Sequence, residues 1–506
     1  MAAFLHPTSA ANSSERPVNE LKITCAEAEC SLFCGRVSHQ TVTLPRQAMV
    51  SVSASTVMGL LARCGSVELE SECGAKARCS SRRWSWHSRK VRPAVCREQP
   101  AVIDSAKAII YHENPVLTAG FSWYTIVLMI ERKTDIALIR TALKRSRVVA
   151  LLGPRQCGKT TLARTFVPAD SLNYFDLEDP QSVARLAQPD MALRPLKGLV
   201  VIDEVQRASE IFPLLRVLAD RRPLPARFLI LGSASPDLLR QSSESLAGRL
   251  ETIAMEGFRL SDVGAGAMAK HWLRGGFPLS FTARGNTDSL TWRTQFLQTF
   301  LERDMPQLGV SIPAATLRRF WMMVAHYHGQ IWNSAEIGRA LAINETTVRR
   351  YLDLMSDVFM VRQVRPWFEN LGKRQVKAPK VYVRDSGLLH ALLNVSNQRD
   401  LEEHPKVGAS WEGYAMEEII KCFHPGEAYF WATHNGAELD LLLFKGGKRI
   451  GVECKRMDAP AMTPSIRHAL TDLKLDHLHV VYPGTRRYAL AENVDVIPLA
   501  EFVSAK

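Results

Sequence analysis

The sequence predicts an α/β fold in which a parallel sheet is connected by crossover helices. The first indication is a series of apolar, strand-like runs at residues 148–152, 171–177, 199–202 and 228–231. Helical stretches separate these runs, and strands that alternate with helices are typical of a parallel sheet. The second indication is a glycine-rich loop directly after the first run. The third is a pair of carboxylates directly after the run at 199–202.

Two helices are expected around the first strand. Residues 131–146 form an amphipathic run that leads into it, and residues 161–166 continue the chain as a helix after the glycine-rich loop. A strand, a tight loop and a helix in succession are the elements that begin a parallel βαβ unit.

The composition is that of an ordinary globular protein. Apolar residues make up 46% and charged residues 23% of the 506 residues, so the chain is long enough for two to four domains. A net charge of +13 favours an acidic partner such as nucleic acid, although a solvated basic surface is the alternative explanation. The longest apolar stretch, residues 117–130, is shorter than the ~20 residues that span a bilayer. We therefore expect a cytoplasmic protein that makes no contact with a membrane.

The first 128 residues differ from the rest of the chain. They show little periodicity and hold seven of the ten cysteines, none of which has the paired CxxC spacing of a zinc site. We predict that this segment is disordered or is not part of the natural product, with translation starting at Met129.

The glycine-rich loop follows the pattern G-x-x-x-x-G-K-[ST]. Glycines let backbone N–H groups curl around a phosphate, and the helix that follows directs its positive dipole end at the same anion. Lys159 is expected to reach the β and γ phosphates of ATP, and the Thr160 hydroxyl is expected to bind Mg²⁺. The predicted nucleotide-binding residues in this loop are Gly153, Pro154, Arg155, Gln156, Cys157, Gly158, Lys159, Thr160 and Thr161.

A second element completes the predicted nucleotide site. In LVVIDEVQR, an apolar run ends in two carboxylates. We predict that Asp203 holds Mg²⁺ and its water shell and that Glu204 is the general base. The alternative is an acidic strand end that caps a helix.

Two further residues are candidates for contact with the γ-phosphate. The strand in RFLILGSAS ends in Ser233 and Ser235, which would bind the γ-phosphate or position water, unless they lie in a solvated turn. Arg249 in SLAGRLE is the candidate cation for charge on the transferring phosphoryl group, with a surface salt bridge as the alternative.

These motifs resemble a widespread family of bacterial and archaeal AAA-type ATPases. The similarity is found in GPRQCGKTTL, VVIDEVQR, ILGSAS, SLAGRLE, LRGGFPLSF and FLERDMPQLGV, and it extends from Met129 nearly to the C-terminus. It implies a P-loop ATPase domain at residues 129–262, a middle domain at 263–400, and a C-terminal domain at 401–506. This last domain is of unknown function and is similar to restriction endonucleases.

The middle domain is expected to be helical and winged-helix-like. Residues 334–355 show two short amphipathic helices with a break at 342–344, and Arg349 and Arg350 lie on the outer face of the second. Such a unit binds DNA or packs between domains. The following VFMVRQVRPW would form the wing. A basic stretch then contains Lys373, Arg374, Lys377 and Lys380, which would contact phosphates or solvent.

The C-terminal third predicts a helix at 411–423 followed by three strands, a helix and a strand. Two of the strands are joined by KGGK as a tight hairpin, and Asp440, Glu453 and Lys455 lie on this pair. The arrangement resembles the PD-(D/E)xK nuclease core, with Glu412 matching its helical acidic residue, although Leu439 stands where that motif has proline. The resemblance implies that Asp440, Glu453 and Glu412 bind a metal and that Lys455 assists catalysis. A surface salt-bridge ladder is the alternative.

The preferred function is that of a Mg²⁺-dependent ATPase that acts on DNA through its C-terminal domain. The alternative is a nucleotide-dependent regulatory protein, in which a catalytically silent nuclease-like domain contacts a protein partner or a second copy of the chain.

Overall fold

The computed structural model divides the chain into two compact units, Met1–Glu131 and Arg132–Lys506. In the first unit it describes the backbones of eight strands only. From Ile130 to Ser504 it also describes side chains, except at residues 234–243, 308–311, 369–375, 424–426 and 435. Each unit is described by itself below.

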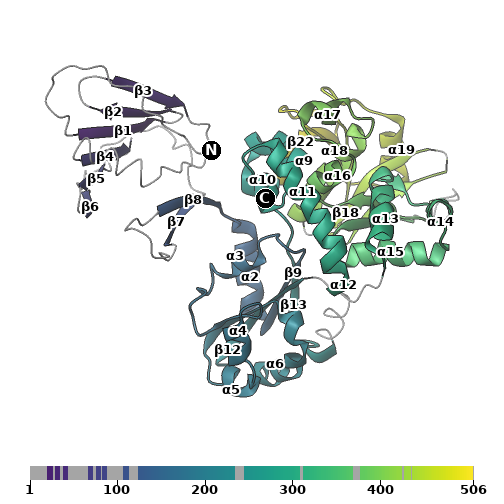
Figure 1. Cartoon of the computed structure of the whole chain (residues 1–506). Helices are drawn as coiled ribbons and strands as arrows, with labels where there is room; N and C mark the ends of the chain where they lie inside the picture. The colour runs from purple at the N-terminus through teal and green to yellow at the C-terminus, as the bar shows by residue number, and fades with distance from the viewer. Residues whose placement is uncertain are drawn as a thin grey trace. The chain divides into compact units, whose positions relative to one another are not determined.

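The first unit contains a six-stranded sheet with the order β3-β2-β1-β4-β5-β6 and a separate antiparallel pair, β7 and β8 (Figure 1). The sequence predicts that this segment is disordered or is not part of the natural product, and that stays a prediction; the residues between the strands lie outside the described part. The strands are β1 (Glu20–Ala26), β2 (Glu29–Cys34), β3 (Ser38–Thr43), β4 (Ser66–Ser71), β5 (Lys76–Ser80), β6 (Arg83–His87), β7 (Ala106–His112) and β8 (Tyr124–Ile130).

The second unit begins with a five-stranded parallel sheet of order β10-β11-β12-β9-β13. This confirms the parallel sheet predicted from the sequence, and β13 is a strand that the sequence analysis did not identify. The strands are β9 (Val148–Gly153), β10 (Tyr174–Asp176), β11 (Gly198–Asp203), β12 (Ala226–Ser233) and β13 (Leu250–Ala254). All five strands run in the same direction, so their carboxyl ends meet at one edge.

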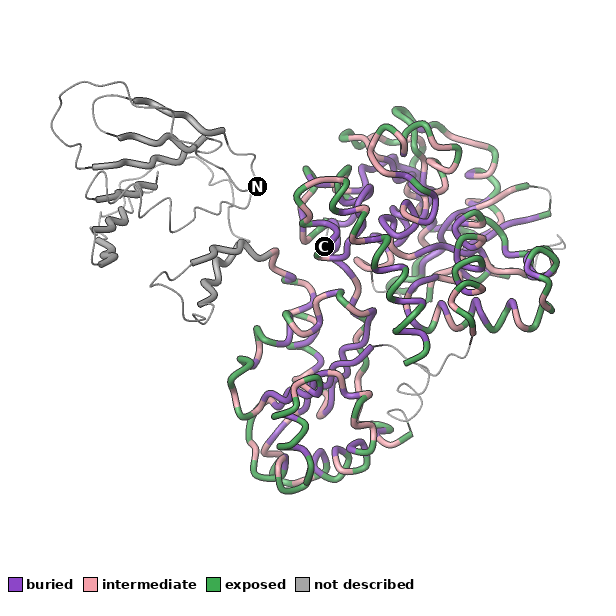
Figure 2. Tube along the Cα trace, viewed as in Figure 1, coloured by how far each residue is buried: buried purple, intermediate pink, exposed green. Residues whose placement is uncertain are grey.

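Helices cover this sheet and explain the apolar character of its central strands. Every residue of β9 is buried, and so are the last four residues of β11, as expected for strands that are covered on both faces (Figure 2). The helices here are α2 (Lys133–Arg145), α3 (Lys159–Ala163), α4 (Pro180–Arg185), α5 (Pro189–Leu193), the 3₁₀ helix η1 (Val205–Ile211) and α6 (Phe212–Ala219).

The middle of the chain is helical, as the sequence predicts. Its helices are α8 (Leu260–Val263), η2 (Ala265–Ala267), α9 (Met268–Arg274), α10 (Pro278–Phe281), α11 (Asn286–Thr299), the π-helix η3 (Phe300–Asp304), α12 (Met305–Gln307), α13 (Ala314–His326), α14 (Ser334–Leu341), α15 (Glu345–Asp357), α16 (Ser386–Leu392) and α17 (Gln398–Glu403). Among the helices described, none is both long enough and apolar enough to pass through a bilayer.

Helices α14 and α15 form the predicted helix-turn-helix shape. Ala342, with φ of 55°, turns the chain between them, and Val348, Leu352 and Met355 of α15 are buried, as the pattern predicts. The strands that follow, β15 (Val361–Pro366) and β16 (Lys380–Val383), pair antiparallel, but they do not form a separate wing. Both belong to the large C-terminal sheet, because β15 also pairs with the next strand, β17.

The C-terminal part is organised around a nine-stranded mixed sheet of order β14-β16-β15-β17-β18-β19-β20-β22-β21. Its remaining strands are β14 (Gln330–Ile331), β17 (Ala428–Ala432), β18 (Glu438–Lys445), β19 (Lys448–Cys454), β20 (His477–Tyr482), β21 (Tyr488–Ala491) and β22 (Val494–Pro498). The helices are α18 (Val407–Phe423), α19 (Pro464–Leu473) and α20 (Leu499–Ser504). Gly446 and Gly447, both with positive φ, make the predicted turn between β18 and β19.

Candidate functional site

The glycine-rich loop leaves the carboxyl end of β9 and runs into α3. Gly158 has φ of 97°, a left-handed conformation that favours glycine. Gly153 is required for a different reason, because a Cβ atom there would lie 1.9 Å from the Met255 carbonyl oxygen. Gln156 is left-handed as well, with φ of 61°. This backbone directs the loop around the first turn of α3, where a helix has unpaired N–H groups.

Lys159 opens α3 and is almost completely buried. Its Nζ donates hydrogen bonds to the carbonyl oxygens of Gly153 and Pro154, at 3.0 and 2.9 Å. The ammonium group is therefore held inside the loop. Lys159 is predicted to bind phosphate together with the N–H groups of this loop. Thr160 is half-buried beside it and Thr161 is exposed. The phosphate-binding role of Lys159 and the Mg²⁺-binding role of Thr160 stay predictions.

The two carboxylates stand where β11 ends. Asp203 is buried and accepts hydrogen bonds from the Tyr174 hydroxyl at 3.0 Å and from the Glu204 N–H at 2.9 Å. Glu204 has φ of 55°, and burial raises the pKa of its carboxyl group. It precedes η1, but its side chain makes no capping bond to the described backbone of that helix. The helix-cap alternative therefore does not describe this residue.

Ser233 ends β12 directly beside Gly153 on β9. It is buried, and its Oγ has no hydrogen-bond partner within the described part of the chain, while the neighbouring Ser235 lies outside that part. A cavity of about 270 Å³ adjoins it. The cavity is lined by Pro154, Arg155, Glu204, Gln206, Arg207, Ser233, Phe300, Asp304, Gln307 and Val358.

Residues from the middle of the chain close one side of this cavity. Arg155 of the loop donates to Asp304 of η3 at 2.5 Å and to Gln307 of α12 at 3.2 Å. It also contacts Glu178 at 3.2 Å. The loop motif predicts Arg155 in the nucleotide site, but no pattern in the sequence predicts Asp304 beside it. A π-helical turn such as η3 is frequent at functional sites, but it cannot be read from the residue pattern.

Arg249 lies at the other end of the sheet. Its backbone carbonyl accepts a hydrogen bond from Val148, the first residue of β9, and it directly precedes β13. Its guanidinium makes two bonds to Asp220, at 2.8 and 2.7 Å. Within this chain, Arg249 therefore lies at the edge of the sheet opposite the glycine-rich loop. Its contacts are those of the alternative, a salt bridge.

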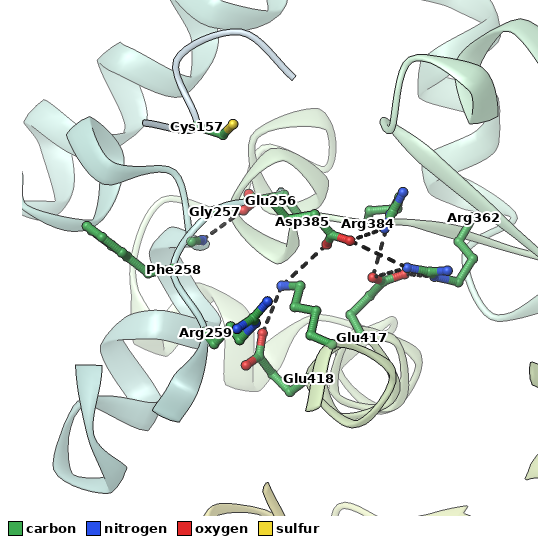
Figure 3. Close-up of polar contacts among 12 residues, drawn as sticks. Cys157, Glu256, Gly257, Phe258, Arg259, Arg362, Arg384, Asp385, Glu417 and Glu418 are labelled. Carbon is green, nitrogen blue, oxygen red and sulfur yellow. Dashed lines mark hydrogen bonds and ion pairs between the residues drawn. The ribbon is translucent and has the colours of Figure 1, made fainter. Parts of the chain in front are cut away.

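A buried arginine links the loop to the segment that follows β13. Arg132 donates to the Cys157 carbonyl at 2.8 Å, to the Glu256 carbonyl at 2.7 Å and to the Gly257 carbonyl at 2.9 Å. Cys157 itself is buried, and this burial raises the pKa of its thiol. The Arg132 side chain thus connects the loop with the chain around Glu256; Cys157, Glu256 and Gly257 are labelled in Figure 3.

The Glu256 side chain points away from the loop into a group of charges (Figure 3). It pairs with Arg384, and it lies 3.8 Å from both Arg362 and Lys421. Burial raises the pKa of the Glu256 carboxyl, and Arg384, Lys421 and Arg362 lower it by more, to about 2. Glu417 binds Arg362 and Glu418 binds Lys421 from α18. These ion pairs connect the end of the ATPase-like sheet with the C-terminal sheet and helix α18.

A second group of functional candidates gathers on the C-terminal sheet. Asp440 accepts a hydrogen bond from the Cys454 N–H at 2.8 Å, and Lys455 binds Glu453 at 2.7 Å. Asp440 and Glu453 are 6% and 4% exposed, so they do not form a ladder on a solvated sheet face. Glu412 of α18 joins them, because Lys380 lies 3.2 Å from Glu412 and 3.6 Å from Asp440. The structure thus brings all four predicted residues together.

Lys380 is a residue of this group that the sequence analysis assigned elsewhere. It was expected in an exposed basic stretch, but it is 3% exposed on β16 and also pairs with Glu438. Tyr382, two residues along the same strand, donates to Glu412 at 2.6 Å. Lys373 and Arg374 lie outside the described residues, and Lys377 is exposed. The alternation in KVYV is the signal that would have placed Lys380 and Tyr382 on one face of a strand.

The group carries a negative charge that is only partly balanced. Four carboxylates, those of Glu412, Glu438, Asp440 and Glu453, face two ammonium groups, which leaves a net charge of −2 when all are ionised. Burial, with the neighbouring Asp440 charge, raises the pKa of Glu412 to about 7 and that of Glu453 to about 8. The Oε2 atom of Glu453 is buried with no hydrogen-bond partner among the described residues. Carboxylate oxygens that lack balancing charge are the ligands that Mg²⁺ takes in proteins.

The parallel sheet and the loop at its carboxyl edge define a P-loop NTPase of the AAA class. A family model described as an AAA domain matches residues 145–263, and this confirms the predicted class. Two models described as domains of unknown function, DUF8612 and DUF4143, match residues 266–399 and 407–502. The C-terminal domain of unknown function is thereby confirmed.

Two relatives show the family. The uncharacterized proteins Mb2031c of Mycobacterium bovis and Rv2008c of Mycobacterium tuberculosis are each 50% identical to this chain over 393 residues. The match covers 78% of this chain and 88% of each relative. The chain therefore belongs to the protein family of these two mycobacterial proteins.

Solved structures are similar over parts of the chain. The Walker-type ATPase PABY2304 of Pyrococcus abyssi is 14% identical and covers 52% of this chain and 96% of its own, with a TM-score of 0.38. The P-loop NTPase domain of the sigma-54 transport activator from E. coli is 19% identical and covers 25% of this chain and 99% of its own, with a TM-score of 0.19. The class assignment rests on the AAA match and on the sheet itself.

Proposed function

We propose that this protein is a Mg²⁺-dependent ATPase. The observation that carries the proposal is the meeting of three strand ends at one edge of the parallel sheet: Gly153 with its loop, Asp203 with Glu204, and Ser233. In open α/β sheets, ligands bind at the carboxyl ends of the strands. The Ser233 hydroxyl, which has no hydrogen-bond partner among the described residues, and the cavity beside it fit a terminal phosphate.

Each residue has a proposed part in the reaction. The loop amides, the amino end of α3 and Lys159 bind the phosphates, and Ser233 orients the γ-phosphate. Thr160 and Asp203 would hold Mg²⁺, which neutralises phosphate charge when bound. Asp203 fits this part because it is ionisable, buried and oriented by Tyr174. Glu204 accepts a proton from the attacking water, and its raised pKa suits a base that works near neutral pH.

Substitution of Lys159 by alanine tests the binding of ATP. We expect the affinity for Mg²⁺·ATP in calorimetry to fall by a factor on the order of 100 or more, because charge-assisted bonds of about 1.5–3 kcal/mol each are lost. Lys144→Ala, which removes an exposed lysine from nearby α2, is the matched control and should bind as the wild type does. Equal affinity of the wild type and Lys159→Ala would contradict the proposed site.

We further propose that the C-terminal domain binds DNA and cleaves it. The proposal is supported by the buried carboxylates of Asp440, Glu453 and Glu412, with Lys455 beside them. Three carboxylate ligands, in a group of four carboxylates and two ammonium groups whose net charge is −2, suit a divalent ion, and Lys455 would act on a scissile phosphate. The net charge of the whole chain, +13, favours an acidic partner.

Plasmid nicking with Mg²⁺ tests this second activity. Asp440→Asn and Lys455→Ala should each slow nicking at least about 100-fold, since they remove a metal ligand and the lysine beside it. The control is Asp458→Asn, an exposed carboxylate shortly after β19, which should nick like the wild type. DNA binding should weaken steeply as salt rises.

A second function is favoured by the position of Lys380. Its ammonium group lies among Glu412, Glu438 and Asp440, where it supplies positive charge that a metal ion would otherwise bring. In that case the domain is catalytically silent, and ATP binding regulates its contact with a protein partner or a second copy of the chain. Equal nicking by the wild type, Asp440→Asn and Lys455→Ala would favour this function over cleavage.

A further inference from the structure

Two histidines and an aspartate lie close together near the β21 end of the nine-stranded C-terminal sheet. His477 and His479 stand two residues apart on β20, so their side chains share a face of the strand. Asp495 of β22 lies directly beside His479 in the parallel register. Within the described part of the chain, these residues bring one ligand atom each to within 4.8 Å of the others.

The two imidazoles are directed at the same oxygen atom. His477 Nε2 lies 3.0 Å from Asp495 Oδ1, and His479 Nδ1 lies 2.5 Å from it. The ring centroids are 4.4 Å apart. Two imidazole nitrogens and one carboxylate oxygen are ligand types that zinc and other transition metals bind.

Neighbouring residues hold the aspartate through its other oxygen, Oδ2, so that only the two histidines contact Oδ1 among the described side chains. Arg487 binds the other oxygen, Oδ2, through Nε at 2.8 Å and Nη2 at 2.5 Å. Glu501 lies 3.4 Å from the same guanidinium and offsets part of its charge. Carboxylates that bind metals are commonly fixed by such outer hydrogen bonds. Phe502 packs edge-on against His479, with ring centroids 4.9 Å apart, and restricts its rotation.

We propose that His477, His479 and Asp495 bind Zn²⁺. Zinc takes nitrogen and oxygen ligands at about 2.0–2.2 Å in a tetrahedral arrangement, in which the ligand atoms lie about 3.3 Å apart. The observed N–O separations of 3.0 and 2.5 Å need to open by less than about 1 Å. The ligand atoms of the two histidines lie within 4.8 Å of each other and need to approach to about 3.3 Å, so zinc would require rotations of these side chains. Each neutral imidazole then carries its proton on the nitrogen that faces away from the metal. Water takes the fourth position, because the His477 side chain is 34% exposed.

Zinc at this position would fasten β22 to β20. The segment between these two strands contains β21. The metal would therefore cross-link the two strands at either end of that segment. Ion binding to the folded state alone stabilises that state. The site is independent of the nucleotide site and of the Asp440 group, so its test does not depend on either proposed activity.

Calorimetric titration of the full chain with Zn²⁺ tests the proposal. We expect the wild type to bind one more equivalent than His477→Ala/His479→Ala, and single His479→Ala to weaken that binding at least about 100-fold. Comparison with the variant is required because ten cysteines elsewhere can also bind zinc. His468→Ala, at an exposed position on α19, is the matched control and should behave as the wild type does. Equal stoichiometry of the wild type and the double variant would overturn the proposal.

A second measurement uses the wild type alone and does not depend on the folding of a variant. Diethylpyrocarbonate modifies free imidazole nitrogens, and mass spectrometry assigns the modified histidines. Zn²⁺ should reduce the modification of His477 at least about tenfold and leave His468 unchanged. Equal modification of His477 with and without Zn²⁺ would show that the cluster is only a hydrogen-bonded support of the sheet.

Discussion

Glu204→Gln is expected to bind Mg²⁺·ATP as the wild type does and to hydrolyse it about 10²- to 10⁴-fold more slowly. This range is what a positioned general base contributes. The substitution keeps the size of the side chain and its contact with Gln206, but the amide cannot accept a proton from water. Phosphate release gives the rate, and calorimetry gives the affinity, so the two effects are measured separately.

The control for this prediction is Glu210→Gln. Glu210 is an exposed carboxylate on the same 3₁₀ helix that follows Glu204, so its loss changes the local charge equally. It should leave turnover unchanged. Full turnover in Glu204→Gln would remove Glu204 from the role of base and leave only the binding function of the site.

Glu256→Gln is expected to lower the free energy of unfolding by about 3–5 kcal/mol, the cost of removing one partner from a buried ion pair. The Glu256 side chain is 17% exposed and balances Arg384, Arg362 and Lys421. Without its charge, these three cations keep only Glu417 and Glu418 as carboxylate partners among the described ion pairs. Urea unfolding followed by circular dichroism measures the change.

The pH dependence of this effect provides an independent check. The folded-state pKa of Glu256 is lowered to about 2, so its stabilising contribution is complete above its ordinary pKa of 4.5. The difference between the wild type and Glu256→Gln should therefore shrink as the pH falls from 4.5 toward 2. Glu403→Gln, which breaks an exposed pair with Arg399, should cost no more than about 0.5 kcal/mol. A similar cost for both variants would contradict the role given to Glu256.

Local patterns in the sequence were enough to predict much of the fold. The fully buried β9 is a continuous apolar run, and α15 shows its buried face as Val348, Leu352 and Met355. The loop at Gly153 to Thr160 could be predicted because its function requires a fixed spacing within one segment. The same is true of the hairpin at Gly446 and Gly447, which needs positive φ at both residues.

The errors concern charges whose partners are distant in sequence. Arg249 was the candidate cation for the transferring phosphoryl group, with a salt bridge as the alternative, but its position depends on the direction of β13. Since β13 runs parallel to β9, its first residue lies at the end of the sheet opposite the loop. Lys380 was assigned to a basic stretch, and only the pairing of β16 with β15 buries it among carboxylates.

By itself, the sequence predicted four of the five strands of the parallel sheet, the place of the glycine-rich loop, and which carboxylates and lysine of the C-terminal domain lie together. Those features are encoded in the period of a strand or helix and in the spacing of one motif. Only the tertiary structure decided that Asp304 binds Arg155 and that Glu256 lies beside three cations. It also decided that the ligand atoms of His477, His479 and Asp495 lie within 4.8 Å of one another. Burying a charged group costs free energy unless the group is paired with an opposite charge. The sequence does not show which partner is close enough, because that depends on how distant segments pack in the folded chain.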